Sequence, residues 1–201
     1  MTATSPTALR SAAEKTTTIV IGTGFSALAV AAELNRQGVA AIVVDSFCPL
    51  NQAVPSQPAT GGISLDDLSE RSEVLRILEH YARRHSLDIR PSTQAMELSC
   101  QIQQGEAAQR QWRVRTGSGT LSAHTLVFTR GALSQLRRVL HAMGVTSAAD
   151  VRASMQSLGL YLVGVGDLAL PSTVEILHQA KRAAQSIKSR VALPQTSFTF
   201  A

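Results

Sequence analysis

The sequence predicts an α/β fold with a mainly parallel sheet, and three observations lead to that prediction. Short runs of β-branched and aliphatic residues end at glycine or aspartate, as buried parallel strands do. Segments with apolar residues at helical spacing alternate with these runs. Hydrophobic residues make up 44% of the chain and charged residues 16%, a composition that can fill a core. The 201 residues have the length of one domain.

The first predicted unit is a strand, a helix and a second strand. Residues 16–21 form a β-branched run that ends at Gly22. Residues 25–37 then place small and aliphatic side chains at helical spacing, with polar side chains between them. A second apolar run, residues 40–44, ends at Asp45. This pattern is typical of a βαβ unit, in which a crossover helix joins two parallel strands.

The remaining elements follow from the same patterns and from turn residues. Prolines and glycines between residues 49 and 62 indicate a loop. Beyond it the sequence predicts a helix capped at Ser64, a short strand at 87–89 that stops at Pro91, and antiparallel strands at 93–103, 111–116 and 120–124. Buried strands are predicted at 125–128 and 160–163, with two short helices between them, the second of which is capped at Ser147. A final helix is capped by Ser172. The antiparallel strands are expected to form a β-meander within residues 95–124.

The ends of the chain and its cysteines bear on organisation and compartment. Residues 1–15 are expected to be a flexible tail and residues 192–201 a C-terminal tail, which leaves residues 16–191 as a single domain. No run approaches the ~18 apolar residues of a membrane span, and the N-terminus has no signal-peptide block. Cys48 and Cys100 are far apart and form no Cys-x-x-Cys motif, which indicates free thiols. We therefore expect a cytoplasmic protein with no membrane partner.

Composition and spacing argue against two further kinds of site. Aromatic residues, at 4%, are too few for a protein that stacks bases on rings, so we expect no nucleic-acid partner. His80 and His85 are five apart on a predicted helix, the wrong spacing for one face, so we predict no metal site. On the same helix, Arg71 and Arg76 are expected to face water. The net charge of +5 is compatible with an anionic ligand without requiring one.

One motif carries chemistry: Gly22-x-Gly24-x-x-Ala27, between the first strand and the first helix. Gly22 permits a tight turn, Gly24 lets a diphosphate approach the backbone, and Ala27 lets the helix lie close to the sheet. The exposed N–H groups and the positive end of the helix suit phosphate. Asp45 ends the next strand at the spacing at which an acidic side chain binds a ribose 2′-OH. The alternative is a packed turn that binds nothing.

The surrounding sequence indicates which dinucleotide this motif would bind. Residues 19–45 resemble the FAD-binding start of the two-dinucleotide-domain flavoproteins, the superfamily of flavin-containing monooxygenases and pyridine nucleotide-disulfide reductases. The predicted meander is similar to theirs, and residues 93–98 and 112–116 resemble the monooxygenase branch most closely. The resemblance implies a Rossmann-like parallel sheet with strand order 3-2-1-4-5, the meander, and FAD as the cofactor.

Two later motifs extend the resemblance. Residues 126–131 are similar to the family's Ala-Thr-Gly strand end, with Thr129 and Arg130 in place of Ala and Thr. Residues 160–167 resemble its late Gly-Asp motif, and the following helix would point its N-terminus at the flavin ring. Carried across, the resemblance implies these FAD-binding residues: Gly22, Gly24, Phe25, Ser26, Ala27, Asp45, Ser46, Ala95, Thr129, Gly131, Gly166, Asp167, Thr173 and Val174.

The resemblance also implies roles for single residues. Asp45 would bind the adenosine ribose, Ala95 would present its backbone to the adenine, and Asp167 would bind the ribityl hydroxyls. Full-length relatives insert an NAD(P)H domain where this chain has residues 132–159, a stretch shorter than a single βαβ unit of ~30 residues and expected to be a short helical replacement. No catalytic residue can be carried over.

The predicted function is a small, monooxygenase-like FAD-dependent oxidoreductase that acts on a small organic substrate. Electrons would come from a partner protein, from transiently bound NAD(P)H or from the substrate itself. A second copy of the chain or a partner protein would cover the flavin face that the missing domain normally covers. Two alternatives stay open: a non-catalytic FAD-binding or scaffold subunit, and an NAD(P)-binding protein.

Overall fold

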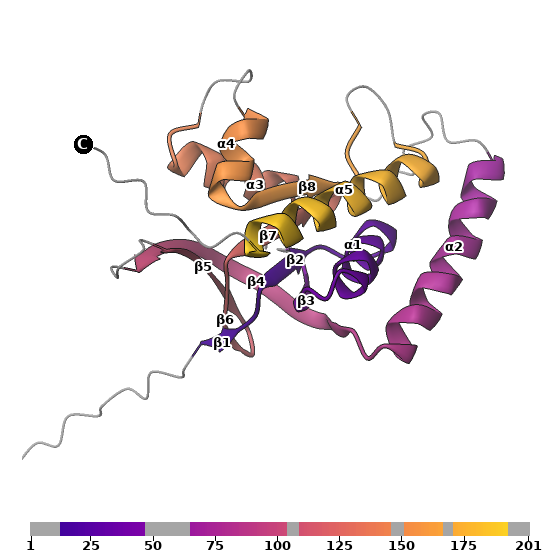
Figure 1. The fold of residues 1–201 in the computed structure, drawn as a ribbon, viewed down its shortest axis with the longest axis horizontal. Coiled ribbons are helices and arrows are strands. Elements are labelled where there is room, and N and C mark those ends of the chain that lie inside the picture. The colour runs from indigo at the N-terminus through magenta and orange to yellow at the C-terminus, as the bar shows by residue number, and fades with distance from the viewer. Residues whose placement is uncertain (1–12, 47–64, 104–108, 146–150, 167–170, 193–201) are drawn as a thin grey trace, which may run out of the picture.

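The computed structural model describes residues 13–46, 65–103, 109–145, 151–166 and 171–192, which Figure 1 draws in colour. Their strands join one sheet in the order β1-β6-β5-β4-β3-β2-β7-β8. The strands are β1 (Glu14–Lys15), β2 (Thr18–Ile21), β3 (Ala41–Asp45), β4 (Asp88–Gln103), β5 (Gln109–Thr116), β6 (Gly119–Ala123), β7 (Thr125–Thr129) and β8 (Leu160–Val163). The helices are α1 (Phe25–Arg36), α2 (Leu65–Arg84), α3 (Leu133–Ala142), α4 (Val151–Leu158) and α5 (Thr173–Ala192), and a 3-10 turn, η1 (Arg130–Ala132), precedes α3.

The parallel part of the sheet has the predicted order. β4, β3, β2, β7 and β8 lie side by side, and each neighbouring pair is parallel. Numbered along the chain without the meander, this is the order 3-2-1-4-5. The carboxyl ends of β2, β3, β7 and β8 therefore meet along one edge of the sheet, the carboxyl edge. The edge at which these strands begin is called the amino edge below.

β4 differs from the prediction. A short strand was expected to stop at Pro91 before a separate strand began, whereas β4 runs through both. Its pairing with β3 is irregular, because Val44 lies opposite Arg90 while the next residue, Asp45, lies opposite Gln94. Pro91 falls in this irregularity, where its missing N–H costs no ladder hydrogen bond. A single strand thus carries the sheet from its parallel part into the antiparallel meander of β4, β5 and β6.

The sheet also begins earlier in the chain than predicted. β1 lies within the expected tail of residues 1–15 and pairs in parallel with β6. The N–H of Thr16 continues this pairing by donating to the carbonyl of Ser122 at 2.9 Å. The prediction of a tail is therefore wrong for Glu14 and Lys15, and the earlier part of that tail lies outside the described residues.

Alternate side chains of the parallel strands enter two hydrophobic cores, one on each face of the sheet. Val20, Val43 and Val127 pack with α1 and α5 on one face. Ile21 and Phe128 pack on the other face with α3, α4 and the inward side chains of the meander. In Figure 1, α5 crosses α1 closely, and α2 stands beside α1 at the outside of the molecule. The period-2 alternation of the strands thus produces a sheet covered on both sides.

The segment between β7 and β8 forms two short helices, as predicted, and side chains from elsewhere hold the second one. The indole N–H of Trp112 donates to the carbonyl of Leu158 at 2.9 Å. The guanidinium of Arg190 donates to the carbonyls of Gln156 at 2.7 Å and Ser157 at 3.1 Å. These donors satisfy carbonyls at the end of α4, where a positive charge also suits the helix dipole. α4 is therefore tied to both the meander and α5.

The predicted helix caps are resolved in part. The Oγ of Ser172 accepts a hydrogen bond from the N–H of Glu175 at 3.2 Å, which confirms the cap of α5. The caps predicted at Ser64 and Ser147 lie outside the described residues. No helix in the described ranges combines the length and the hydropathy of a bilayer-spanning segment.

Candidate functional site

The turn between β2 and α1 presents backbone N–H groups at the carboxyl edge. Gly24 is the N-cap of α1, with φ +79° and ψ −159°, a conformation almost restricted to glycine. No side chain caps this helix, and its first backbone hydrogen bond runs from the N–H of Leu28 to the carbonyl of Gly24, at 3.1 Å. The N–H groups of residues 25–27 therefore point out of the helix end with no capping side chain among the described residues.

The two glycines of this turn are required for different reasons. A Cβ on Gly22 would overlap Thr129 Oγ1 and would lie 2.9 Å from Thr129 Cβ, so only glycine lets β2 lie this close to the end of β7. Thr129 is held in place because its hydroxyl donates to the carbonyl of Ile21 at 3.2 Å. A Cβ on Gly24 would instead meet no atom of the described residues within 4 Å. Gly22 thus packs the sheet, while none of the described residues fills the space next to Gly24.

A second glycine turn lies against the first. Gly164 follows β8 with φ +81°, and a Cβ on it would overlap the side chain of Ser26 in the first turn of α1. The N–H of Gly164 donates to Oε1 of Gln179 at 2.8 Å, and Nε2 of Gln179 donates to the carbonyl of Val165 at 3.0 Å. The backbone after β8 is therefore fixed between α1 and α5, and Gly166 follows directly. Its neighbour Asp167 lies outside the described residues.

The end of β3 brings polar groups to the same edge. The carboxylate of Asp45 accepts a hydrogen bond from the N–H of Ser46 at 2.7 Å. A Cβ on Gly131, in η1, would lie 3.6 Å from Ser46 Oγ, so these two predicted residues are neighbours. Asp45 lies opposite Gln94, directly before the buried Ala95. The Asp45 carboxylate, which is expected to meet a ribose, thus lies beside the strand that is expected to meet the adenine.

Arg71 is a residue of this region that the sequence analysis assigned to solvent. Its Nη2 donates to the carbonyl of Pro171 at 2.8 Å, and its Nε donates to Thr173 Oγ1 at 3.4 Å. Its guanidinium carbon lies 5.7 Å from the centre of the Phe25 ring, within cation–π range. Arg71 therefore connects α2 to the first turns of both α1 and α5. The signal was present in the helical spacing, since residue 71 lies one turn before the half-buried Val74.

The first turn of α5 supplies the last two predicted residues. Thr173 is fully buried at the start of the helix, and Val174 has an exposed fraction of 51%. The geometry thus brings four pairs together: Gly22 with Thr129, Ser26 with Gly164, Ser46 with Gly131, and Phe25 with Arg71. Among the described residues, no three His, Cys, Asp or Glu side chains are grouped closely enough to hold a metal ion.

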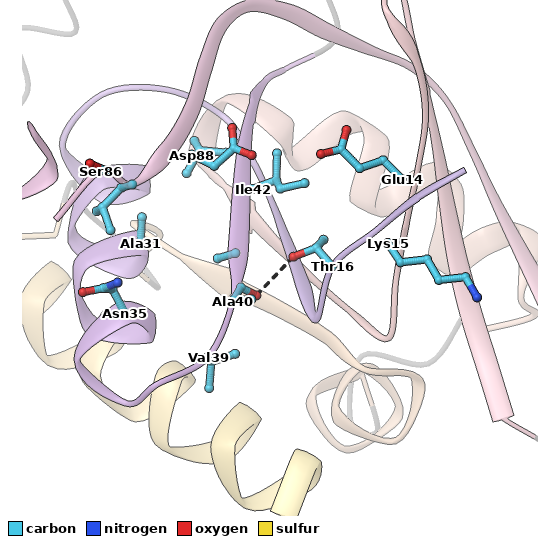
Figure 2. A pocket seen from close by; sticks show the side chains of 13 residues that line it. Glu14, Lys15, Thr16, Ala31, Asn35, Val39, Ala40, Ile42, Ser86 and Asp88 are labelled. Carbon is cyan, nitrogen blue, oxygen red and sulfur yellow. Dashed lines mark hydrogen bonds between the residues drawn. The ribbon is translucent and has the colours of Figure 1, made fainter. Parts of the chain in front are cut away.

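A cavity of about 300 Å³ lies at the opposite, amino edge and contains none of the predicted cofactor residues. Figure 2 shows the carboxylates of Glu14 and Asp88 on its rim and the hydroxyl of Thr16 bonded to the carbonyl of Ala40. Arg90 donates to both carboxylates, at 2.6 Å to Glu14 Oε1 and 2.7 Å to Asp88 Oδ2. This hydrogen bond from Arg90 holds the pKa of Glu14 below its ordinary value. The two carboxylates on the rim therefore already have a partner.

Comparison with known proteins identifies the fold. No protein-family model matches this chain, and no curated protein matches it. Among solved structures, THI4 from Thermovibrio ammonificans is 13% identical over 89% of this chain and 91% of that chain, with a TM-score of 0.54. A mutant flavin monooxygenase from Stenotrophomonas maltophilia is 13% identical over 89% of this chain and 100% of that chain, with a TM-score of 0.52.

A third similar structure differs in coverage. A thioredoxin reductase from Gloeobacter violaceus is 16% identical over 57% of this chain, with a TM-score of 0.36, and the match covers 36% of the reductase chain. Identities this low show a shared fold and nothing finer. The chain shares the α/β fold of THI4 and of the flavin monooxygenase.

Proposed function

We propose that this chain is a small FAD-dependent oxidoreductase of the monooxygenase-like type. The observation that carries the proposal is the pair of glycine turns at the carboxyl edge. In the described part of the chain, a Cβ on Gly24 would meet no atom within 4 Å, and no side chain caps the N–H groups of residues 25–27. A helix N-terminus of this kind binds phosphate, and in open α/β sheets ligands bind at the carboxyl ends of the strands.

The described residues fit an adenine dinucleotide in extended form. The diphosphate would lie against the first turn of α1, and Asp45 and Ser46 would hold the adenosine ribose. Asp45 is well placed because its half-buried carboxylate ends β3 and is already oriented by the Ser46 N–H. The flavin end would lie towards Gly166 and the first turn of α5, where the exposed Val174 offers an apolar contact.

When bound, FAD would supply the two-electron redox chemistry, while the protein supplies position and electrostatics. α1 and α5 both direct their N-termini, the positive ends of their dipoles, to the carboxyl edge and so favour the anionic parts of the cofactor. We propose a small organic substrate, with electrons from a partner protein, from transient NAD(P)H or from the substrate. The resemblance implies that full-length relatives carry a nicotinamide domain in the segment that here forms α3 and α4, and we propose that a second copy or a partner protein covers the flavin.

The visible spectrum of the purified protein tests the proposal most simply. A yellow protein with flavin bands, or a colourless one that takes up added FAD in a one-to-one ratio, supports it. A colourless protein that ignores FAD but binds NAD(P) would instead establish the nicotinamide alternative. Reducing the bound flavin with dithionite and then admitting oxygen and candidate substrates separates an enzyme, which turns over, from a scaffold subunit, which holds an inert flavin.

A further inference from the structure

The side chain of Gln179, on α5, forms two hydrogen bonds with the backbone of another segment, the turn after β8. Its Oε1 accepts the N–H of Gly164 at 2.8 Å, and its Nε2 donates to the carbonyl of Val165 at 3.0 Å. One side-chain amide thus bonds two successive residues of the turn after β8. A carboxamide has both the acceptor and the donor that this contact needs.

The orientation of this amide is determined by a third contact. Nε2 of Gln179 also donates to Oε1 of Glu175, one turn earlier on α5, at 3.2 Å. An amide flipped by 180° would place Oε1 against the Glu175 carboxylate and the Val165 carbonyl, and Nε2 against an N–H donor. All three contacts would then be repulsive. The side chain therefore holds the turn in one arrangement, with its donor and acceptor sides assigned by chemistry.

The turn that Gln179 holds is also in contact with the first glycine motif. Gly164 is buried with φ +81°, and no Cβ could be added there without meeting Ser26. Ser26 is one of the residues whose N–H groups leave the N-terminus of α1. A displacement of Gly164 would therefore remove the backbone surface against which Ser26, in the first turn of α1, packs. Gln179 fixes the relative position of the two turns.

We propose that Gln179 is a positioning residue for the cofactor of this chain. It touches no predicted cofactor residue through its own side chain in the described structure, and it acts by holding Gly164 and Val165 in front of Gly166 and against Ser26. The inference rests on the proposed function, since it concerns the FAD site. Gln179 would be a further residue of the FAD site, although it lies outside the glycine motifs of the sequence and six residues after the start of α5.

The test compares Gln179→Leu with Gln185→Leu. Leucine keeps the approximate size of the side chain and removes both backbone contacts, whereas Gln185 is an exposed glutamine on the same helix and serves as the matched control. The full chain is stripped of flavin, refolded if needed, and titrated with FAD by flavin fluorescence. Loss of two neutral hydrogen bonds predicts an increase in the Kd for FAD of about tenfold for Gln179→Leu. Gln185→Leu is expected to stay within about twofold of the wild type, because exposed sites contribute little.

Two further readouts separate positioning from general stability. Thermal unfolding of each apoprotein measures the structural cost alone, and the visible circular dichroism at saturating FAD reports how the flavin is held. We expect that spectrum to change in Gln179→Leu and not in Gln185→Leu. Gln179→Glu serves if the leucine variant does not fold: it keeps an acceptor for Gly164 but loses both donors, and we expect its Kd to rise by at least about threefold.

The outcomes are distinguishable. A raised Kd together with an altered flavin spectrum supports the inference. An unchanged Kd and spectrum, even with a lower unfolding temperature, would show that Gln179 is only structural and would overturn the inference while leaving the proposed function intact. A wild-type protein that does not bind FAD would overturn the proposed function, and this inference with it.

Discussion

The two edges of the parallel sheet differ in what they offer a ligand. The amino edge has a cavity of about 300 Å³ lined by apolar, polar and charged residues, but Arg90 already pairs the two carboxylates on its rim. The carboxyl edge offers backbone: the first turns of α1 and α5, and glycines at positive φ such as Gly24 and Gly164. Concavity alone would point to the amino edge. The backbone N–H groups of residues 25–27, which no side chain caps in the described structure, favour the carboxyl edge as the ligand site.

This difference reflects the strands themselves. A parallel strand that ends at glycine lets the chain turn closely into a helix, whose N-terminus then faces the same edge. The carboxyl-terminal ends of these helices lie at the amino edge. The chain enters its strands there with polar side chains such as Thr16, which donates a hydrogen bond, and Asp88, which forms an ion pair.

Gly22→Ala should cause the largest loss of stability. The added methyl group would overlap Thr129 Oγ1 at a φ of +132°, so β2 and β7 must separate or Thr129 must move. We expect the free energy of unfolding to fall by about 3 kcal/mol or more, measured by urea denaturation of the apoprotein. Gly117→Ala is the control, because a Cβ there meets no described residue within 4 Å and its φ is not positive. Equal stability of the two variants would contradict the close contact of Gly22 with Thr129.

Gly24→Ala and Gly38→Ala compare the two edges directly. Both glycines have nearly the same φ, +79° and +74°, and at either position a Cβ meets no atom of the described ranges within 4 Å. Each substitution should cost about 1–3 kcal/mol of stability through backbone strain. Only Gly24→Ala should weaken FAD binding, by at least about tenfold, because its methyl group enters the space in front of the α1 N–H groups. Equal Kd values in a fluorescence titration would remove the basis for placing the diphosphate there.

Arg71→Met should weaken FAD binding less than Gly24→Ala does. It removes the hydrogen bonds to Pro171 and Thr173 and the contact with Phe25, while keeping an unbranched apolar side chain. We expect the Kd for FAD to rise about threefold to fivefold and the free energy of unfolding to fall by about 1–2 kcal/mol. Arg76→Met, at an exposed position on the same helix, is the control and should change neither quantity. A loss of stability with unchanged FAD affinity would restrict Arg71 to a structural role.

The smallest effect is expected at the amino edge, from Glu14. Its pKa is lowered in the folded protein by the hydrogen bond from Arg90, so its contribution to stability is present above the ordinary pKa of 4.5 and is lost as the pH falls through the lowered value. Because Glu14 is half exposed, the contribution should be below about 1 kcal/mol. Glu14→Gln should therefore flatten the acid part of the stability curve in urea unfolding between about pH 7 and about pH 3. The Kd for FAD at neutral pH should not change in Glu14→Gln. A changed Kd would contradict the separation of the FAD site from the amino edge.

The sequence predicts the parallel sheet well because its local signals agree. The β-branched runs that end at Gly22 and Asp45 predict both the strands and their parallel direction. The strand order comes from the resemblance to the flavoprotein superfamily. Pro91 misled because a proline normally ends a strand, whereas here it lies where β4 changes its partner strand. Glu14 and Lys15 carry no strand signal of their own, and it is pairing with β6 that orders them.

The candidate site was predictable in its backbone and less so in its supporting side chains. The glycine motif places Gly24 and residues 25–27 from sequence alone, because the turn is local. The contacts of Thr129 with Gly22 and of Gln179 with Gly164 join segments far apart in the chain, so no local pattern reveals them. Arg71 was assigned to solvent because it is charged, although its helical position places it near the buried stripe. The roles of the site residues and the partner that covers the flavin stay predictions.

Calorimetric titration of the apoprotein with FAD shows whether a flavin nucleotide binds at the carboxyl edge, with Gly24→Ala and Gly38→Ala titrated in parallel. We expect heat of binding with one FAD per chain for the wild type and for Gly38→Ala, and greatly weakened binding for Gly24→Ala. Absence of heat for the wild type, or the same binding curve for Gly24→Ala as for Gly38→Ala, would contradict the placement of a flavin nucleotide at the carboxyl edge.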